Sequence, residues 1–180
     1  MQLILVRHPQ PDIAPGLCYG STDVAVSNSA IAQVAARLRA AGLPGALPVF
    51  ASPLARCALL AHELGAPASL APRLAEMDFG AGEMRAWDAI PRAEIDAWAA
   101  DLLHYRPGGG ENVLDVARRV AAFRDALQAG GHSGALLVCH AGTMRLLSAL
   151  DAGDSIEEAA LQAASRPHSI GYGQAITLKD

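Results

Sequence analysis

The stretch QLILVRHPQP, residues 2–11, decides the fold class because a buried strand ends within it on two chemically active side chains. Residues 3–6 are consecutively apolar, which is typical of a short strand covered on both faces of its sheet. The apolar run stops at Arg7 and His8, and two prolines directly behind them oppose any continuation of the strand. We therefore predict a guanidinium and an imidazole at the carboxyl end of the first core strand.

Similar apolar runs recur along the chain and alternate with helical patterns. Further strands are expected at residues 46–51 (ALPVFA), 135–140 (ALLVCH) and 170–178 (IGYGQAITL). Helices are expected over residues 27–42, 52–65, 86–103 and 142–153 and from residue 113 onward. Short apolar strands that are each followed by a helix predict an α/β fold with three layers, α/β/α, and a mainly parallel central sheet.

Capping residues set the expected starts of these helices. Ser27 or Asn28 is the expected N-cap of the first helix, and Asn112 that of the helix from residue 113. Ser52 is the expected N-cap of the second helix, with Pro53 at the first helical position.

Length and composition predict one globular domain over residues 1–180. The chain has 52% hydrophobic and 18% charged residues, which is enough apolar surface for a full core. Residues 77–112 are less regular and are expected to form a cap or lid segment. Within it, PGGGEN (107–112) lacks the GK[ST] ending of a nucleotide loop and is interpreted as a hinge or lid element over the site.

Charge and cysteine usage restrict the partners and the compartment. The net charge of −4 and a pI near 5.8 argue against nucleic acid or an anionic membrane surface as the main partner. No apolar run approaches the roughly 18 residues of a membrane span, and no signal-peptide pattern precedes the first strand. Three scattered cysteines without a CxxC pair indicate neither a disulfide framework nor a zinc site. A cytoplasmic protein is expected.

The charged and imidazole side chains at the strand ends are expected to converge, because ligands bind beyond the carboxyl ends of parallel strands. Arg7 and Arg56 carry planar guanidinium forks that suit a phosphate or a carboxylate. The helix that follows His140 adds free backbone N–H groups, with Gly142 allowing close approach. These groups predict an anion site.

The same groups can transfer a phosphoryl group. Two histidines among two arginines should have lowered pKa values, and a neutral imidazole is a competent nucleophile toward phosphorus. An alkoxide leaving group also needs a proton. Glu76 and Asp78, in LAEMDFG (74–80), are the candidate acids.

Several motifs in order resemble the histidine phosphatase superfamily, which has the phosphoglycerate mutase-like fold. They are LVRHPQP, GLCYGSTDVAVS, SPLARC, RLAEMDFGAGE, PGGGEN and LLVCHAGTMR, and the resemblance runs from residue 3 to about residue 146. Within the superfamily the chain is most similar to the α-ribazole phosphatase group, which dephosphorylates a nucleotide-like intermediate late in cobalamin synthesis.

The resemblance implies a role for each matching residue. It implies that His8 is the phosphorylated nucleophile and that Glu76 protonates the leaving group. It implies a phosphate pocket formed by Arg7, Arg56, His140 and Ala141. The implied activity is that of a metal-independent phosphomonoesterase without a cofactor, whose small-molecule substrate is α-ribazole 5′-phosphate.

The chain also departs from the family pattern. Pro9 stands where glycine usually follows the Arg-His pair, and Ala14 stands where many members have an asparagine phosphate ligand. The run after SPLARC has ALLA where a threonine is common, and Ala141-Gly142 replaces a frequent glycine pair. Loss of the asparagine removes one donor to the phosphate and leaves the core groups in place.

Other functions are compatible with parts of the same pattern. A phosphoglycerate mutase or a broad-specificity histidine phosphatase shares the motifs, and a non-catalytic phosphate-binding protein shares the fold. Cys139 to Arg145 reads C-x-x-G-x-x-R, the spacing of cysteine-dependent phosphatases, although alternation along the strand points the Cys139 side chain away from that of His140. A buried structural thiol is the preferred interpretation.

The remaining histidines and aromatic residues are interpreted as structural. A metal site at His8 and His140 is not expected, because no HxH or HExxH is present and two guanidiniums would repel a dication. The other four histidines are interpreted as surface or structural residues, namely His62, His104, His132 and His168. Core packing is expected for Trp87, Trp98 and Tyr105, with a wall that stacks on a heterocyclic substrate as the alternative.

Overall fold

The computed structural model describes residues 1–43, 47–65 and 67–178. In this part of the chain, five strands form one sheet in the order β3-β2-β4-β1-β5. Their bounds are Gln2–Arg7 for β1, Val49–Ala51 for β2, Ala68–Leu70 for β3, Gly134–Cys139 for β4 and Ala175–Leu178 for β5. All neighbouring strands are parallel except β5, which runs antiparallel to β1. The predicted mainly parallel sheet is confirmed.

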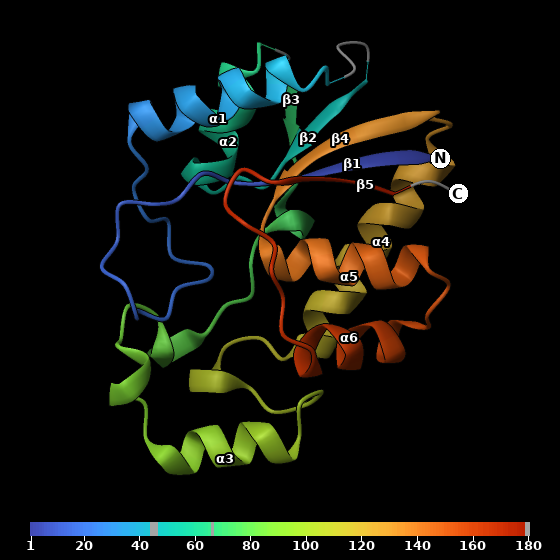
Figure 1. Ribbon diagram of the computed structural model, residues 1–180. Helices are drawn as coiled ribbons and strands as arrows, with labels where there is room; N and C mark the ends of the chain where they lie inside the picture. Colours follow the sequence, from blue (N-terminus) through green and yellow to red (C-terminus); the bar gives the residue numbers. More distant parts are fainter. Residues whose placement is uncertain (44–46, 66, 179–180) are drawn as a thin grey trace.

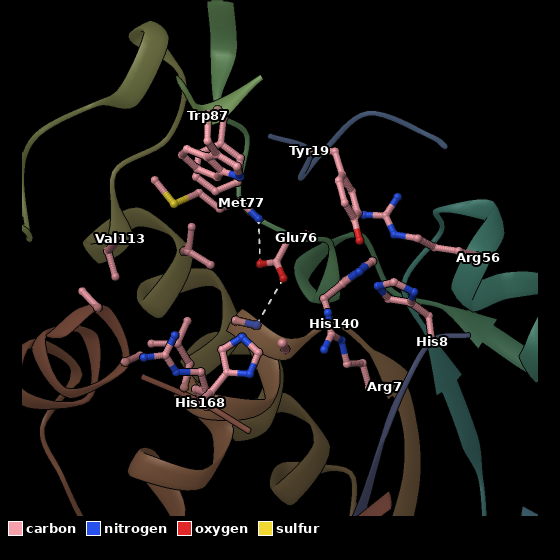
Figure 2. Close-up of a pocket in the computed structure, with 18 of the residues that line it drawn as sticks. Arg7, His8, Tyr19, Arg56, Glu76, Met77, Trp87, Val113, His140 and His168 are labelled. Atoms are coloured by element: carbon pink, nitrogen blue, oxygen red, sulfur yellow. Dashed lines mark hydrogen bonds between the residues drawn. The ribbon is translucent and has the colours of Figure 1, made fainter. Parts of the chain in front are cut away.

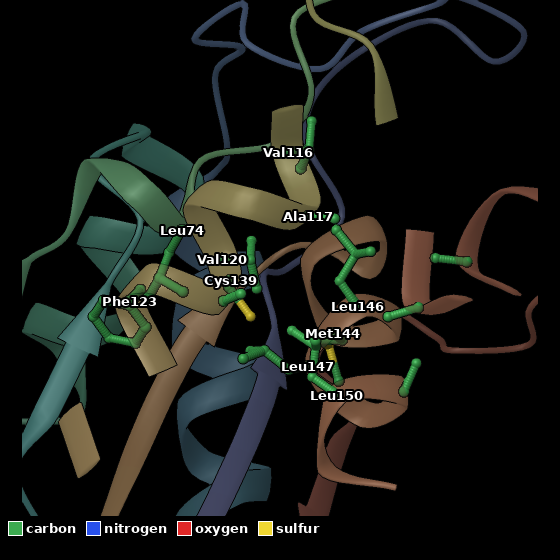
Figure 3. Packing of buried hydrophobic residues seen from close by; sticks show 14 of the residues in the cluster. Leu74, Val116, Ala117, Val120, Phe123, Cys139, Met144, Leu146, Leu147 and Leu150 are labelled. Atoms are coloured by element: carbon green, nitrogen blue, oxygen red, sulfur yellow. The ribbon is translucent and has the colours of Figure 1, made fainter. Parts of the chain in front are cut away.

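Helices cover both faces of this sheet (Figure 1). The bounds are Asn28–Ala40 for α1, Ala55–Glu63 for α2, Val113–Ala129 for α4, Ala141–Asp151 for α5 and Ile156–Ser165 for α6. Alternate side chains of β1 serve the two faces: Ile4 and Val6 pack with α1 and α2, whereas Leu3 and Leu5 pack with α4 and α5. Figure 3 shows the core cluster on the face covered by α4 and α5. Helix α6 also contributes buried residues to this cluster. The three-layer prediction is confirmed.

Two of the predicted N-caps are confirmed and one is wrong. Ser27 accepts a hydrogen bond from the Ala30 N–H at 3.2 Å, and Asn112 accepts one from the Asp115 N–H at 2.7 Å. Ser52 does not cap α2, which begins three residues later with Leu54 in the N-cap position. The Ser52 hydroxyl instead lies 2.8 Å from Nε2 of His140, across the sheet end.

Other differences from the predicted elements have local causes. The predicted helix over 86–103 is a 3₁₀ turn at Trp87–Ala89 followed by α3 at Arg92–Ala100, because Ile90 is extended before Pro91. The last strand begins at Ala175, since residues 171–174 form a turn. Strand β3 and helix α6 were not predicted, and Ala46 of the expected second strand lies outside the described residues.

The irregular segment 77–112 packs against the loop that follows β1, beyond the carboxyl ends of the parallel strands (Figure 1). The backbones of Cys18 and Met84 are joined at 2.7 Å, and Leu17 forms an antiparallel bridge with Ala86. The glycine-rich run 107–112 packs on the turn at Gly80, where any Cβ would lie 2.3 Å from a backbone oxygen. Segment 77–112 is therefore joined to the loop after β1 and is closed on itself at Gly80.

Candidate active site

The residues predicted at the strand ends converge on one cavity of about 490 Å³. Arg7 is the last residue of β1 and His8 follows it directly. Arg56 lies in the first turn of α2, and His140 directly follows β4. Glu76 reaches the same cavity from the segment before the cap (Figure 2). The sheet topology thus brings together five side chains that are as many as 133 positions apart in sequence, from Arg7 to His140.

The His8 imidazole is held in one tautomer by its neighbour. Its Nδ1 donates a hydrogen bond to the Pro9 carbonyl oxygen at 2.7 Å, so the lone pair lies on Nε2. His8 is only 2% exposed, and burial, together with the charges of Arg56 and Arg7, lowers its pKa to about 3, although the hydrogen bond to Pro9 opposes the shift. The ring is therefore uncharged at neutral pH, with a nucleophilic nitrogen available.

Arg56 is fully buried and Arg7 half-buried, and neither has a carboxylate partner in the described part of the chain. Arg7 donates from Nη1 to the Ile170 carbonyl oxygen at 2.5 Å. In both side chains the Nε–H is buried and has no hydrogen-bond partner among the described residues. A guanidinium with a buried, unpaired donor is costly, and an anionic group between the two guanidiniums reduces that cost.

Arg56 is oriented by the loop after β1. Its terminal nitrogens donate to the carbonyl oxygens of Gly20 at 2.6 Å and Thr22 at 2.9 Å. The other side of this loop is held by Glu83, whose carboxylate accepts from the backbone N–H groups of residues 20–22 at 3.0 to 3.2 Å and from the Thr22 hydroxyl at 2.6 Å. Glu83 belongs to segment 77–112, so this segment holds the loop that orients Arg56.

His140 is fixed by the residue that was expected to cap a helix. Its Nε2 lies 2.8 Å from the Ser52 hydroxyl, and the ring is 1% exposed. Burial first, and then the neighbouring His8 and Arg56, lower the pKa of His140 well below its usual value. The rings of His8 and His140 have centroids 5.1 Å apart, so two neutral imidazoles face the same space.

Glu76, rather than Asp78, faces the cavity. The Glu76 carboxylate accepts from the N–H of Gly142, at the start of α5, at 3.1 Å, and from the Met77 N–H at 3.0 Å (Figure 2). A Cβ at Gly142 would lie 2.5 Å from this carboxylate, which explains the need for glycine there. Asp78 is not among the described residues that line the cavity, and it accepts from the Gly80 N–H at 2.8 Å within its own turn.

A support for Glu76 was not predicted from the sequence. Arg119 donates to the carbonyl oxygens of Ala75 at 2.7 Å and Glu76 at 3.2 Å, and it forms a two-pronged ion pair with Glu111 at 2.8 and 2.9 Å. Glu111 belongs to PGGGEN, which was interpreted only as a hinge or lid. Glu111 and Arg119 therefore hold the chain segment that carries Glu76.

The Cys139 thiol lies in the hydrophobic core and is not among the described residues that line the cavity. It is fully buried in the core cluster, and Figure 3 shows it near Val120 and Met144. Burial, and secondarily the negative charge of Glu76, raise its pKa far above that of a free thiol. This environment is that of a structural cysteine and disfavours a thiolate nucleophile.

Other cavity residues were missed in the sequence. Tyr19, Tyr172, Arg145 and His168 all line the cavity, and His168 is exposed at the surface, as interpreted from the sequence. Tyr19 and Arg145 lie within the motifs GLCYGSTDVAVS and LLVCHAGTMR, whereas Tyr172 and His168 lie in a loop outside any of the motifs. Ala141 lines the cavity as the first residue of α5, where backbone N–H groups lack intrahelical partners.

The aromatic residues Phe79, Trp87 and Trp98 line the main cavity and also the smaller cavity beside it. The expected core packing is wrong for Trp87, which is 41% exposed. The two indole rings stack at a centroid distance of 6.5 Å. Tyr105 lines the smaller cavity. Ala14 is exposed and is not among the described residues that line the main cavity.

Two other kinds of feature are absent from the described residues. Within residues 1–43, 47–65 and 67–178, no three His, Cys, Asp or Glu side chains lie together as a set that could hold a metal ion. None of the helices in these ranges combines the length and the apolar character needed to span a membrane.

Comparison with known proteins decides the family. A model of the histidine phosphatase superfamily (branch 1) matches residues 3–165. The chain belongs to this superfamily. A search of curated proteins returned no match.

Solved structures of two phosphatases and a phosphoglycerate mutase resemble this phosphatase over nearly its whole length. The α-ribazole phosphatase from Shigella flexneri is 26% identical, with a TM-score of 0.80, covering 98% of this chain and 89% of that chain. The mycobacterial glucosyl-3-phosphoglycerate phosphatase is 25% identical, with a TM-score of 0.79, covering 98% and 88%. The phosphoglycerate mutase from Thermus thermophilus is 29% identical, with a TM-score of 0.74, covering 98% and 92%. The predicted family, fold and phosphatase class are confirmed. The three similar proteins are named for different substrates, so the comparisons do not identify the substrate.

Proposed function

We propose that this phosphatase is a metal-independent phosphomonoesterase in which His8 is transiently phosphorylated. The observation that carries the proposal is a neutral imidazole, anchored through Nδ1, beside two guanidiniums with buried, unpaired Nε–H donors in the described structure. A phosphoryl dianion satisfies both guanidiniums and places phosphorus within reach of Nε2. His140 and the N-terminus of α5 supply further N–H donors to the phosphoryl oxygens.

The proposed reaction has two steps. In the first, Nε2 of His8 bonds to phosphorus while the bond from phosphorus to the ester oxygen breaks, and the protonated Glu76 carboxyl donates its proton to the departing alkoxide. In the second, water attacks the phosphohistidine, the Glu76 carboxylate takes the water proton, and inorganic phosphate leaves as His8 regains its lone pair. Arg7 and Arg56 stabilise the charge on the equatorial oxygens in both steps.

The proposed substrate is α-ribazole 5′-phosphate, which places the enzyme in cobalamin synthesis in the cytoplasm. Support comes from the sequence resemblance, from the similar Shigella enzyme and from the aromatic wall of the cavity. Trp87, Trp98 and Phe79 offer flat apolar surface to the heterocyclic base of such a substrate. Segment 77–112 then acts as a cap over the leaving group.

A second candidate is a phosphate ester whose leaving group carries a carboxylate. Arg145 favours it, because this guanidinium lines the same cavity and has no ion pair among the described residues. Values of kcat/KM for α-ribazole 5′-phosphate and 3-phosphoglycerate decide between the two. If Arg145→Ala lowers only the value for 3-phosphoglycerate, and that substrate is the better one, the carboxylate class holds. Mutase turnover above hydrolysis would contradict the proposed reaction class.

The nucleophile is tested by labelling. Quenched reactions with a radioactive phosphoester should leave acid-labile, base-stable phosphate on the wild type and none on His8→Ala, which should also lack turnover. Hydrolysis of p-nitrophenyl phosphate should continue in EDTA. A protein that binds phosphate but never hydrolyses an ester would be a binding protein, and label surviving in His8→Ala would place the nucleophile elsewhere.

A further inference from the structure

Two tyrosines from distant parts of the chain meet at the phosphate end of the cavity. Tyr19 lies in the loop between β1 and α1, and Tyr172 lies between α6 and β5. Their hydroxyl oxygens are 2.8 Å apart, and both residues line the cavity beside His8. Figure 2 shows the Tyr19 hydroxyl pointing into the cavity toward His8 and His140.

Each ring packs against one of the arginines proposed to bind phosphate. The guanidinium carbon of Arg7 lies over the Tyr172 ring, 3.9 Å from its centroid, and that of Arg56 lies 5.5 Å from the Tyr19 centroid. The Tyr172 and His8 ring centroids are 5.6 Å apart. Cation–π contacts of this kind fix the rings, and therefore the two hydroxyls, beside the nucleophile.

The hydrogen-bond inventory of the pair leaves one donor unused. Two hydroxyls carry two protons, and the bond between them uses one. In the described structure neither hydroxyl has another hydrogen-bond partner, so the second O–H is available to the cavity. Burial and the bond to Tyr172 raise the pKa of Tyr19, which keeps the Tyr19 hydroxyl protonated at neutral pH.

We propose that the Tyr19–Tyr172 pair donates this remaining O–H to a non-bridging phosphoryl oxygen. The pair is then a phosphate-binding element in addition to Arg7, Arg56 and His140. The position of the phosphoryl group rests on the proposed function, but the test uses equilibrium binding and therefore does not need turnover.

The test measures binding of inorganic phosphate and of orthovanadate by calorimetry. Tyr19→Phe/Tyr172→Phe keeps both rings and removes both hydroxyls, and it should bind each anion about 10- to 100-fold more weakly than the wild type, the range for a hydrogen bond to a charged group. The single variant that reproduces the double variant's loss identifies the hydroxyl that faces the anion. Tyr105→Phe, at a tyrosine outside the main cavity, is the matched control and should bind normally.

Two results would overturn the inference. The first is binding by the double Phe variant within about twofold of the wild type, well below the loss of a hydrogen bond to a charged group. The second is a loss of binding in Tyr172→Ala together with normal binding in the double Phe variant, which would show that the ring over Arg7 matters and the hydroxyls do not. A wild type that binds phosphate but hydrolyses no ester would refute the proposed reaction, while the binding comparison would still decide the role of the pair.

Discussion

The two ends of the cavity are built in opposite ways. At the end proposed to bind phosphate, His8, Arg56 and His140 are 0 to 2% exposed and are attached directly to the ends of core strands or to the helix start that follows. At the cap end, Trp87 is 41% exposed and lies in a 3₁₀ turn, and α3 has no buried residue. The groups proposed to bind phosphate are supported by the core, whereas the residues proposed to contact the leaving group lie on a segment with little burial. The difference predicts that reaction rate depends on the first end and substrate choice on the second.

Replacement of Glu76 is expected to give the largest effect, as a difference in rate loss between two kinds of substrate. Glu76→Gln should slow hydrolysis of an alkyl phosphate by about 10²- to 10⁴-fold, because an alkoxide cannot leave without a proton. With p-nitrophenyl phosphate the loss should be far smaller, since that leaving group departs as an anion. Steady-state kcat on both substrates measures the split.

Asp78 is the matched control for this acid. Asp78→Asn should affect both substrates alike, because its carboxylate bonds within its own turn and does not line the cavity in the described structure. If Asp78→Asn shows the split and Glu76→Gln does not, the two carboxylates have been assigned the wrong way round.

Arg56→Lys tests whether the phosphate end needs geometry or only charge. The ammonium keeps the positive charge but cannot bond the Gly20 and Thr22 carbonyls and also direct a donor at the phosphoryl group. We expect kcat to fall by about 10²-fold on every substrate, whatever its leaving group. Full activity in Arg56→Lys would show that the planar guanidinium of Arg56 is not required.

Trp87→Ala tests the cap end alone. Loss of the aromatic face should raise KM for α-ribazole 5′-phosphate about tenfold, in the range of one base–aromatic stacking contact. The affinity for inorganic phosphate should not change, because the ring of Trp87 packs on Phe79 and Trp98 within the cap. An equal loss for both ligands would break the proposed separation between the two ends.

The pH dependence of stability tests whether His8 is buried as a neutral ring. His8 has a pKa of about 3 in the folded protein and 6.5 as a reference, so between these values the unfolded chain binds a proton that the folded protein does not. The free energy of unfolding therefore falls as the pH drops from 6.5 toward 3, by up to about 1.4 kcal/mol per pH unit, and above pH 6.5 His8 causes no such loss. His140 acts in the same direction.

Denaturant unfolding at several pH values measures this slope. In His8→Asn, the free energy of unfolding should fall less steeply below pH 6.5 than in the wild type in the same buffers. The difference in slope should correspond to one proton. Equal slopes in the two proteins would mean that His8 is not buried as a neutral ring.

Cys139 offers a separate check on the nucleophile. Because its thiol is buried in the core and its pKa is raised, iodoacetamide at neutral pH should leave phosphatase activity intact. Rapid inactivation that phosphate prevents would favour the cysteine-dependent alternative.

Several site residues were predictable because position along a strand is a local property. An apolar run followed by Arg7 and His8, and another that ends at His140, place these side chains at one sheet edge once the strands are parallel. Ser52 was misread because its hydroxyl can cap a helix or bond a distant imidazole, and only the parallel pairing of β2 with β4 brings His140 within 2.8 Å. Glu111 was read as part of a lid for a similar reason: its role depends on Arg119, which lies about two helical turns further on and also bonds the backbone of Glu76.

The sequence by itself determined the three-layer α/β fold, the family and the groups that are proposed to act on phosphorus. It could do so because hydrophobic periodicity and strand-end motifs are local along the chain. Tertiary structure alone decided that Tyr172 meets Tyr19 across 153 positions and that His168 lines the same space. It also separated Glu76, which the family resemblance already favoured, from Asp78 by placing only Glu76 at the cavity among the described residues. These contacts arise between loops and helix faces with no periodic signal, so their partners are chosen only when the sheet and its covering helices bring the segments together.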